Sequence, residues 1–172
     1  GLPVDQVTAL HRDRDGSLWI GTYSSGLFRM SGSQISSYGI EDGLLNPTVR
    51  AIFEDDEGSL WIGSNGGLEQ LRVGAFVTWN ERNGLTDKYA RAVFEDRSGT
   101  LWVGSANGLS RWENGRWINV EDSRFAGILS IGQSRDGAHW FGTSNGVYRV
   151  DPGGKVTQLT TSDGLSNNSI RD

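Results

Sequence analysis

The stretch DGLLNPTVRAIFEDDEGSLWIGSNGGLEQL, residues 42–71, decides the fold because its landmarks recur along the chain. Its segment LWIGS (60–64) returns as LWIGT (18–22), LWVGS (101–105) and HWFGT (139–143), so the tryptophans are spaced by 42, 41 and 38 residues. A fixed spacing of about 41 residues indicates a chain of structural repeats.

Glycines keep the same register in every copy. A glycine lies three residues before each tryptophan (16, 58, 99, 137), and another lies six or seven residues after it (26, 67, 108, 146). A Gly-Leu pair recurs at 1–2, 43–44, 84–85 and 164–165, and the fourth repeat has Phe125-Ala126-Gly127 in its place. Four landmarks in one register exclude coincidence.

Each repeat predicts four short strands. In the second repeat we expect strands over 49–54, 59–63, 67–71 and 76–79, because apolar and polar residues alternate with a period of two. Asn65-Gly66 is a strong hairpin signal, and 55–58 and 73–74 supply the other turns. No segment shows helical periodicity, so we expect almost no helix.

Repeats of this length, with four antiparallel strands and one tryptophan each, predict an all-β fold, a β-propeller. We expect blades at 1–42, 43–83, 84–122 and 123–163 within one domain (1–172), with 164–172 beginning a fifth. The flanking residues Leu18 and Ile20 should face one neighbouring blade while the tryptophan fills the wedge towards the other. The predicted core tryptophans are Trp19, Trp61, Trp102 and Trp140.

Four blades leave the ring open to three interpretations. The segment could belong to a larger ring, close alone as a four-bladed ring, or be completed by a second copy of itself. An unclosed arc would expose two apolar blade faces, and the residues after 163 repeat the start of a blade. We therefore favour a larger ring or completion by a second copy.

The composition excludes several classes of protein and partner. The 172 residues include 25 glycines, about twice the average share, but only 3 prolines and no cysteine, which excludes collagen and disulfide scaffolds. A net charge of −5 argues against a nucleic-acid partner and against direct contact with an anionic membrane surface. No apolar run is long enough to span a membrane.

The 42–71 stretch closely resembles the propeller repeat of bacterial two-component regulators, through residues such as Asn46, Val49, Glu54-Asp55 and Gly67-Leu68. The resemblance covers essentially the whole chain and is weakest in the fourth repeat. It implies a sensor domain of a membrane histidine kinase, periplasmic or extracellular, with oligosaccharides among the ligands of the family. This segment itself carries no signal peptide. A second, weaker resemblance links the fourth repeat to streptogramin-lyase-type propellers.

Ligand-binding candidates come from two places. The first is the set of loops that lead into the innermost strands (2–6, 44–48, 85–89 and 123–127), since loops on a rigid scaffold often carry function. Their polar or aromatic candidates are Asn46, Asp87, Lys88, Tyr89 and Arg124. Because such loops also vary without function, these are expectations only.

The second place is the innermost strand itself. Arg50 and Arg91 share one repeat position, Arg171 repeats it, and Thr8 and Ser130 are expected there in the other blades. Since this strand lines the central channel, the arginines could bind an anion. We favour the alternative that they pair with Glu54, Asp55, Glu95 or Asp96.

Other motifs have plainer interpretations. The turns 13–16 and 55–58 look like fragments of calcium loops but lack the ligand number, so we expect tight turns capped by aspartate. Trp79, Trp112 and Trp117 could stack on sugars, although packing between blades is favoured. His11 and His139 fall at different repeat positions, and no nucleophile elbow or metal-ligand spacing exists.

We therefore predict a non-catalytic binding segment without cofactor or metal. Its expected partners are an oligosaccharide or another small ligand, together with further blades or a second copy. The alternatives are an enzyme of the lyase type and a purely structural assembly fragment.

Overall fold

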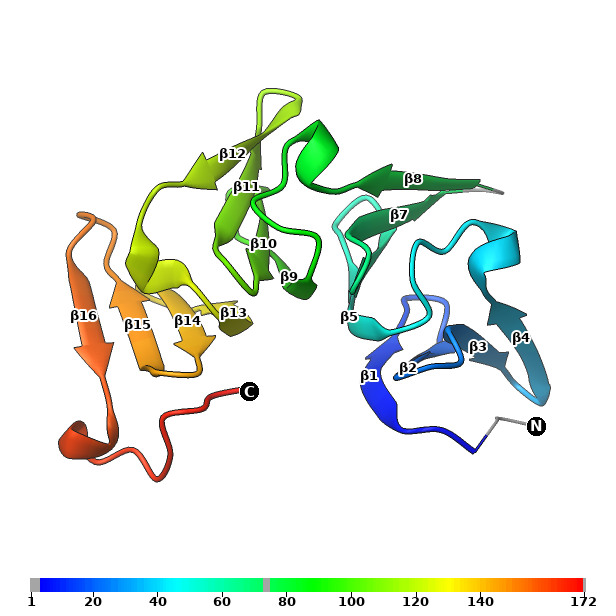
Figure 1. Cartoon of the computed structure of the whole chain (residues 1–172), viewed down its shortest axis with the longest axis horizontal. Helices are drawn as coiled ribbons and strands as arrows, with labels where there is room; N and C mark the ends of the chain where they lie inside the picture. Colours follow the sequence, from blue (N-terminus) through cyan, green and yellow to red (C-terminus); the bar gives the residue numbers. More distant parts are fainter. Residues whose placement is uncertain (1–3, 73–74, 172) are drawn as a thin grey trace.

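The computed structural model describes residues 4–72 and 75–171, which form four separate four-stranded antiparallel sheets. The sheets follow one another along an arc, as the blades of a propeller do (Figure 1). Within each sheet, each strand pairs with the next one in sequence, and the all-β propeller prediction is confirmed. The Gly1-Leu2 marker and the Val73-Gly74 turn lie outside the described residues.

The four blades have the same strand order. Blade 1 contains β1 (Val7–Arg12), β2 (Leu18–Thr22), β3 (Leu27–Ser31) and β4 (Gln34–Tyr38). Blade 2 contains β5 (Val49–Glu54), β6 (Leu60–Ser64), β7 (Leu68–Arg72) and β8 (Ala75–Trp79). Blade 3 contains β9 (Ala90–Glu95), β10 (Leu101–Ser105), β11 (Leu109–Glu113) and β12 (Arg116–Val120). Blade 4 contains β13 (Ile128–Gln133), β14 (His139–Thr143), β15 (Gly146–Val150) and β16 (Val156–Leu159).

The segments after the outer strands form short 3₁₀ turns that the sequence pattern did not predict. They are η1 (Ile40–Asp42), η2 (Glu81–Asn83), η3 (Ser123–Phe125) and η4 (Thr161–Asp163), and the described residues contain no α-helix. The glycine of the Gly-Leu pair ends three of these turns in the left-handed region, with φ of 104° at Gly43 and 116° at Gly84. This conformation explains why glycine is needed there.

The tryptophans of the first three repeats lie between their own blade and the next, whereas the predicted core residue Trp140 is only partly buried and belongs to no core cluster, because no described blade follows blade 4. Trp61 packs with Leu101 and Val103 of blade 3, whereas its neighbours Leu60 and Ile62 pack with Trp19 of blade 1. Trp102 is partly buried against blade 4. The tryptophan of the second strand therefore fills the space towards the following blade, and its two neighbours face the preceding blade. This is the alternation of side chains that a strand predicts.

The glycine two residues after the tryptophan permits close contact between blades. A Cβ on Gly104 would lie 2.8 Å from the Cβ of Ile128, the first residue of the next inner strand, and would also collide with its Cγ2. A Cβ on Gly63 would lie 3.0 Å from the carbonyl oxygen of Ala90. The repeated glycine is thus required by packing rather than by backbone conformation.

The acidic turn of each repeat holds the tryptophan in place. Asp55 accepts hydrogen bonds from the backbone nitrogens of Glu57 and Ser59 and, at 2.7 Å, from the indole Nε1 of Trp61. Asp13 and Asp96 make the corresponding indole contacts, and Ser134 replaces the carboxylate in blade 4. Burial opposes ionisation of Asp96, but hydrogen bonds from Ser98, Trp102 and Thr100 outweigh it and lower its pKa to about 2. The predicted tight turn is present.

The acidic turns lie at one rim of the propeller, and hydrogen bonds link adjacent blades at this rim. The backbone nitrogen of Arg14 donates to Glu54 of the next blade at 2.9 Å, and that of Asp56 donates to Glu95 at 2.9 Å. Arg97 repeats the contact with Gln133. Glu54 and Glu95 therefore tie neighbouring blades together, a role that the sequence did not reveal.

The tryptophans outside the repeat register fill the outer part of the joint between blades 2 and 3. The ring centroids of Trp112 and Trp117 are 5.0 Å apart, and Trp79 lies 5.8 Å from Trp112 and 5.2 Å from Trp61. Packing between blades, the favoured interpretation, accounts for these side chains.

The four blades do not close on themselves (Figure 1). On the free face of blade 1, Val7 and Leu10 are 50% and 61% exposed. Their equivalents in blade 2, Val49 and Ile52, pack against blade 1. The structure therefore does not form the closed four-bladed ring that was one of the three alternatives.

One buried carboxyl group lies at the joint between blades 1 and 2. Glu69 on β7 is fully buried, and its Oε1 accepts a hydrogen bond from the Leu45 nitrogen. Its Oε2 has no partner among the described residues. Burial raises the pKa of Glu69 to about 7, against the lowering effect of hydrogen bonds from Leu45 and Ser64.

This group predicts a pH-dependent stability. Because the folded state holds the proton more tightly than the unfolded state, stability should fall as pH rises from about 4.5 to 7 and stay constant above. Glu69→Gln keeps an acceptor for Leu45 without a charge, so at pH 8 it should exceed the wild type by up to about 3 kcal/mol. Urea unfolding at pH 4.5 and pH 8 measures this difference.

Glu57→Gln is the control, because Glu57 is exposed in the neighbouring turn. This variant removes one exposed carboxylate from the same blade and is measured at the same two pH values. A Glu69→Gln effect of the same size at both pH values would contradict a raised pKa, because it would mean that Glu69 binds its proton equally well in the folded and unfolded states.

Candidate functional site

The innermost strand of every blade contains a β-bulge at its second residue. The pairing of β5 with β6 joins Val49 to Ser64 and Ala51 to Gly63, so Arg50 has no opposite residue. The same irregularity leaves Thr8, Arg91 and Leu129 unpaired in the other blades. A bulge re-aims a side chain away from both sheet faces, and here these four side chains line the central cavity.

This register corrects one sequence assignment. Leu129, and not Ser130, occupies the position of Arg50 and Arg91 in blade 4, because Ser130 pairs with Gly142 as Ala51 pairs with Gly63. Ser130 also lines the cavity, one residue further along the strand. Arg171 reaches the cavity from the segment that follows blade 4, next to Ile170, whose nitrogen donates to the Thr143 carbonyl at 2.9 Å.

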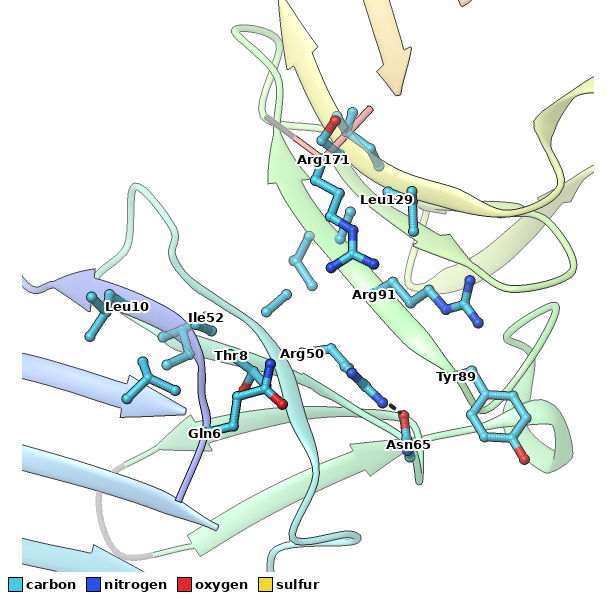
Figure 2. A pocket seen from close by; sticks show the side chains of 17 residues that line it. Gln6, Thr8, Leu10, Arg50, Ile52, Asn65, Tyr89, Arg91, Leu129 and Arg171 are labelled. Carbon is cyan, nitrogen blue, oxygen red and sulfur yellow. Dashed lines mark hydrogen bonds between the residues drawn. The ribbon is translucent and has the colours of Figure 1, made fainter. Parts of the chain in front are cut away.

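The cavity on the inner strands has a volume of about 930 Å³. Figure 2 shows the arginine side chains at its polar side, together with Asn65, Tyr89 and Gln6. Alanines and aliphatic residues of the inner strands form the remaining wall. Among the described residues, no aspartate or glutamate lines this cavity, although the chain has 21 acidic residues and 16 lysines and arginines.

The arginines of the cavity have no carboxylate partner within the described residues. Arg50 donates from Nε to the Asn65 amide oxygen at 3.1 Å, and its guanidinium lies 5.4 Å from the ring centre of Tyr23. Neither Arg91 nor Arg171 forms an ion pair with the described residues. The favoured pairing of Arg50 and Arg91 with the acidic residues was wrong.

The reason is distance along the strand. Arg50 and Arg91 are the second residues of β5 and β9, whereas Glu54 and Glu95 are the last residues of the same strands. Four residues of strand span about 13 Å. Each of these carboxylates instead accepts the hydrogen bond from the preceding blade at the opposite rim.

Of the seven predicted ligand-binding residues, the structure brings Arg50, Arg91 and Tyr89 together at the cavity and places the other four elsewhere. Asn46 and Asp87 accept hydrogen bonds from backbone nitrogens two residues on. Lys88 is exposed, with its ammonium 5.2 Å from the Tyr89 ring. Arg124 forms a bidentate pair with Asp122, donating from Nε to Oδ1 at 2.9 Å and from Nη2 to Oδ2 at 2.6 Å.

Asp87 differs from Asn46 in one respect. It is buried, and its Oδ2 has no hydrogen-bond partner among the described residues. Sequence reasoning placed it on an accessible loop, where an aspartate would be solvated. The bound backbone nitrogen of Tyr89 shows that the side chain turns inwards to shape the loop.

Both histidines lie at joints between blades and outside the cavity lining. His139 Nε2 is 3.1 Å from Asp96 Oδ2 of the preceding blade, and His11 Nε2 is 3.7 Å from Glu54 Oε2 of the next. Neither pair lines the cavity. The described residues contain no group of three metal-ligating side chains.

Sequence reasoning missed two polar members of the cavity. Asn65 was assigned only to a hairpin turn, and Gln6 was not singled out. A hairpin residue that contacts the bulge residue of the same blade cannot be recognised without the register, because the two lie 15 residues apart.

The comparisons with known proteins agree with this architecture. A family model described as the two-component regulator propeller matches residues 1–24, 43–66 and 84–107. Three of the four repeats thus match the model of the two-component regulator propeller family. Each match to this propeller family begins at the Gly-Leu pair and ends within the hairpin after the tryptophan strand. No curated protein matches the chain in a sequence search.

Solved structures show the same fold. An extracellular domain described as part of a hybrid two-component system of B. thetaiotaomicron is 21% identical, with a TM-score of 0.83 over 98% of this chain and 25% of its own. Another such domain from the same organism is 24% identical, with a TM-score of 0.73 over 90% of this chain and 25% of its own. The chain thus spans about a quarter of those domains.

A lyase propeller is also similar in fold. The virginiamycin B lyase of Staphylococcus aureus, in a catalytically inactive form with quinupristin, is 16% identical. Its TM-score is 0.71 over 92% of this chain and 57% of the lyase. Among the described residues, no helix has the length and apolar character needed to cross a membrane.

Proposed function

We propose that this regulator-propeller segment is a non-catalytic, ligand-binding part of a bacterial two-component sensor. The observation that carries the proposal is the cavity of about 930 Å³, whose wall is formed by a bulge residue of every blade. Bulges are frequent next to functional sites, and a cavity with a few convergent polar groups is the usual form of a small-molecule site.

The match of three repeats to the two-component regulator propeller model supports the proposed sensor role and location. Solved relatives in fold are extracellular domains of two-component systems, and we propose a periplasmic or extracellular position for this segment as well. Oligosaccharides are the first ligand class to test. Ligand binding would act on a kinase by changing how the blades pack, since each inner strand belongs both to the cavity and to a blade joint.

The lyase alternative rests on the fold similarity to the streptogramin-inactivating enzyme. A lyase of this kind would need a histidine and a carboxylate at the ligand. Here the two histidine–carboxylate pairs hold blades together and lie outside the cavity lining. Turnover of a streptogramin by the purified chain would establish the enzymatic alternative in place of the sensor role.

The binding proposal is tested by the thermal unfolding midpoint in the presence of neutral and acidic oligosaccharides. A ligand at one hundred times its Kd stabilises by about 2.7 kcal/mol, which for a chain of this size is a rise of roughly 5–10 °C. Tyr89→Ala in the cavity should remove the rise, whereas Ile35→Ala on the exposed outer strand should retain it. A panel without any stabilising member would contradict the proposal.

We further propose that the free face of blade 1 is covered in the native assembly by another blade, of the same protein or of a second copy. Exposed Val7 and Leu10 occupy positions that are packed in blade 2. Exposed apolar surface of this kind favours association. Mass measurement in solution distinguishes a chain that pairs from one that stays single.

A further inference from the structure

We propose that the inner-strand cavity binds an anionic ligand, one that carries at least two carboxylate, sulfate or phosphate groups, held by Arg50, Arg91 and Arg171. The inference rests on the proposed function, since it names the class of ligand for the same cavity. It goes further because the family's fold does not fix the charge of the ligand.

The charge distribution carries the inference. The three arginines come from three positions around one cavity, and no acidic side chain of the described residues lines it (Figure 2). Elsewhere in the described chain, arginines such as Arg29, Arg124 and Arg149 form ion pairs. Concentrating unpaired positive charge in one cavity of a chain with net charge −5 costs electrostatic free energy, and a bound anion removes that cost.

The geometry prepares one guanidinium for the ligand. Arg50 is held from two sides by neutral groups, the Asn65 amide oxygen at Nε and the Tyr23 ring. These contacts limit its rotamers and leave the terminal nitrogens of the guanidinium without a described partner. A planar guanidinium presented in this way suits bidentate binding of an oxyanion.

The arginines come from different parts of the cavity wall, which favours a ligand with more than one acidic group. Arg50 and Arg91 are the bulge residues of neighbouring blades, Leu129 is the bulge residue of blade 4, and Arg171 lines the cavity from the segment after that blade. The ligand should therefore place acidic groups towards both sides and an uncharged part against Leu129. Tyr89 adds an aromatic surface at the rim of the cavity, which is suited to a sugar ring or a similar flat apolar face.

The test is calorimetric titration of the whole chain with three probes: pyrophosphate, a disulfated disaccharide and its uncharged parent disaccharide. The variants are Arg91→Gln and, as control, Arg116→Gln. Arg116 is exposed at the start of the outer strand β12, so the two variants have equal net charge. We expect a charged probe to bind, the uncharged parent not to bind, and higher salt to weaken binding. Arg91→Gln should weaken it at least tenfold and Arg116→Gln less than twofold.

A structural role for Arg91 is separated by the thermal midpoint without ligand. Arg91→Gln should leave that midpoint unchanged or raise it, because no described carboxylate loses a partner. Binding of pyrophosphate as well as the disulfated sugar would support simple phosphate-type anions as ligands, whereas binding of the sugar alone would support an acidic saccharide. Equal binding of the uncharged parent, or unchanged affinity in Arg91→Gln, would overturn the inference and leave the binding function standing. Absence of binding by every probe and every oligosaccharide of the wider panel would overturn both.

Discussion

Gly104→Ala should destabilise the protein by about 2–3 kcal/mol, although it adds a single methyl group. The new Cβ would lie 2.8 Å from the Ile128 Cβ, a contact too short to persist, and Ile128 is fully buried on the next inner strand. Blades 3 and 4 would have to move apart, which exposes the packing around Trp102. For a chain of 172 residues the thermal midpoint should fall by roughly 5–10 °C.

The matched control is Gly132→Ala, on the adjacent strand β13. A Cβ there meets no atom within 4 Å, and the backbone has no positive φ. This variant should be neutral or slightly stabilising. The double variant Gly104→Ala with Ile128→Ala should cost less than the sum of the two single changes, because the second removes part of the collision. Strict additivity, or a Gly104→Ala variant as stable as Gly132→Ala, would contradict the close joint between these blades.

Asp55→Ala should cost about 2–4 kcal/mol, the second large effect that we expect. The change removes three accepted hydrogen bonds, two from the turn backbone and one from the buried indole of Trp61. The indole nitrogen would then be buried without a partner, and the turn would lose its cap. Urea unfolding followed by tryptophan fluorescence measures both the loss of stability and the altered surroundings of Trp61.

Asp56→Ala is the control for charge, since it removes the same carboxylate one residue further on. The Asp56 side chain is 93% exposed, and its contact with Arg14 is 3.4 Å long. The free energy of unfolding should change by less than about 0.5 kcal/mol. Similar losses for Asp55→Ala and Asp56→Ala would mean that charge, and not the indole hydrogen bond, stabilises the turn.

The fold was predictable because the repeat carries it several times over. The tryptophan strand and the hairpin that follows it are present in every blade, and the Gly-Leu landmark corresponds to a 3₁₀ turn that ends in a left-handed glycine at Gly43, Gly84 and Gly164. Gly104 is required because Ile128, 24 positions further on in the next blade, leaves no room for a Cβ. Its presence could be read from the sequence, but its partner could not.

The site was predictable only in part, for physical reasons. Arg50 and Arg91 were placed on the channel strand, yet their charge partners depended on how far Glu54 and Glu95 lie along it and on the rim hydrogen bonds between blades. The bulge at Arg50 directs this side chain into the cavity, and the alternation of apolar and polar residues along the strand does not reveal a bulge. Asp87 turned inwards because a backbone nitrogen captures it, which loop composition does not reveal.

The most direct test of the account is an NMR titration that observes the arginine Nε–Hε groups while the disulfated disaccharide is added to the chain. The account predicts that the resonances of Arg50, Arg91 and Arg171 shift together and saturate with one affinity. Arg14 and Arg97, which bond to carbonyl oxygens at the opposite rim, should not move. Equal shifts at the rim arginines, or saturated binding without change at the three cavity arginines, would contradict ligand binding in the inner-strand cavity.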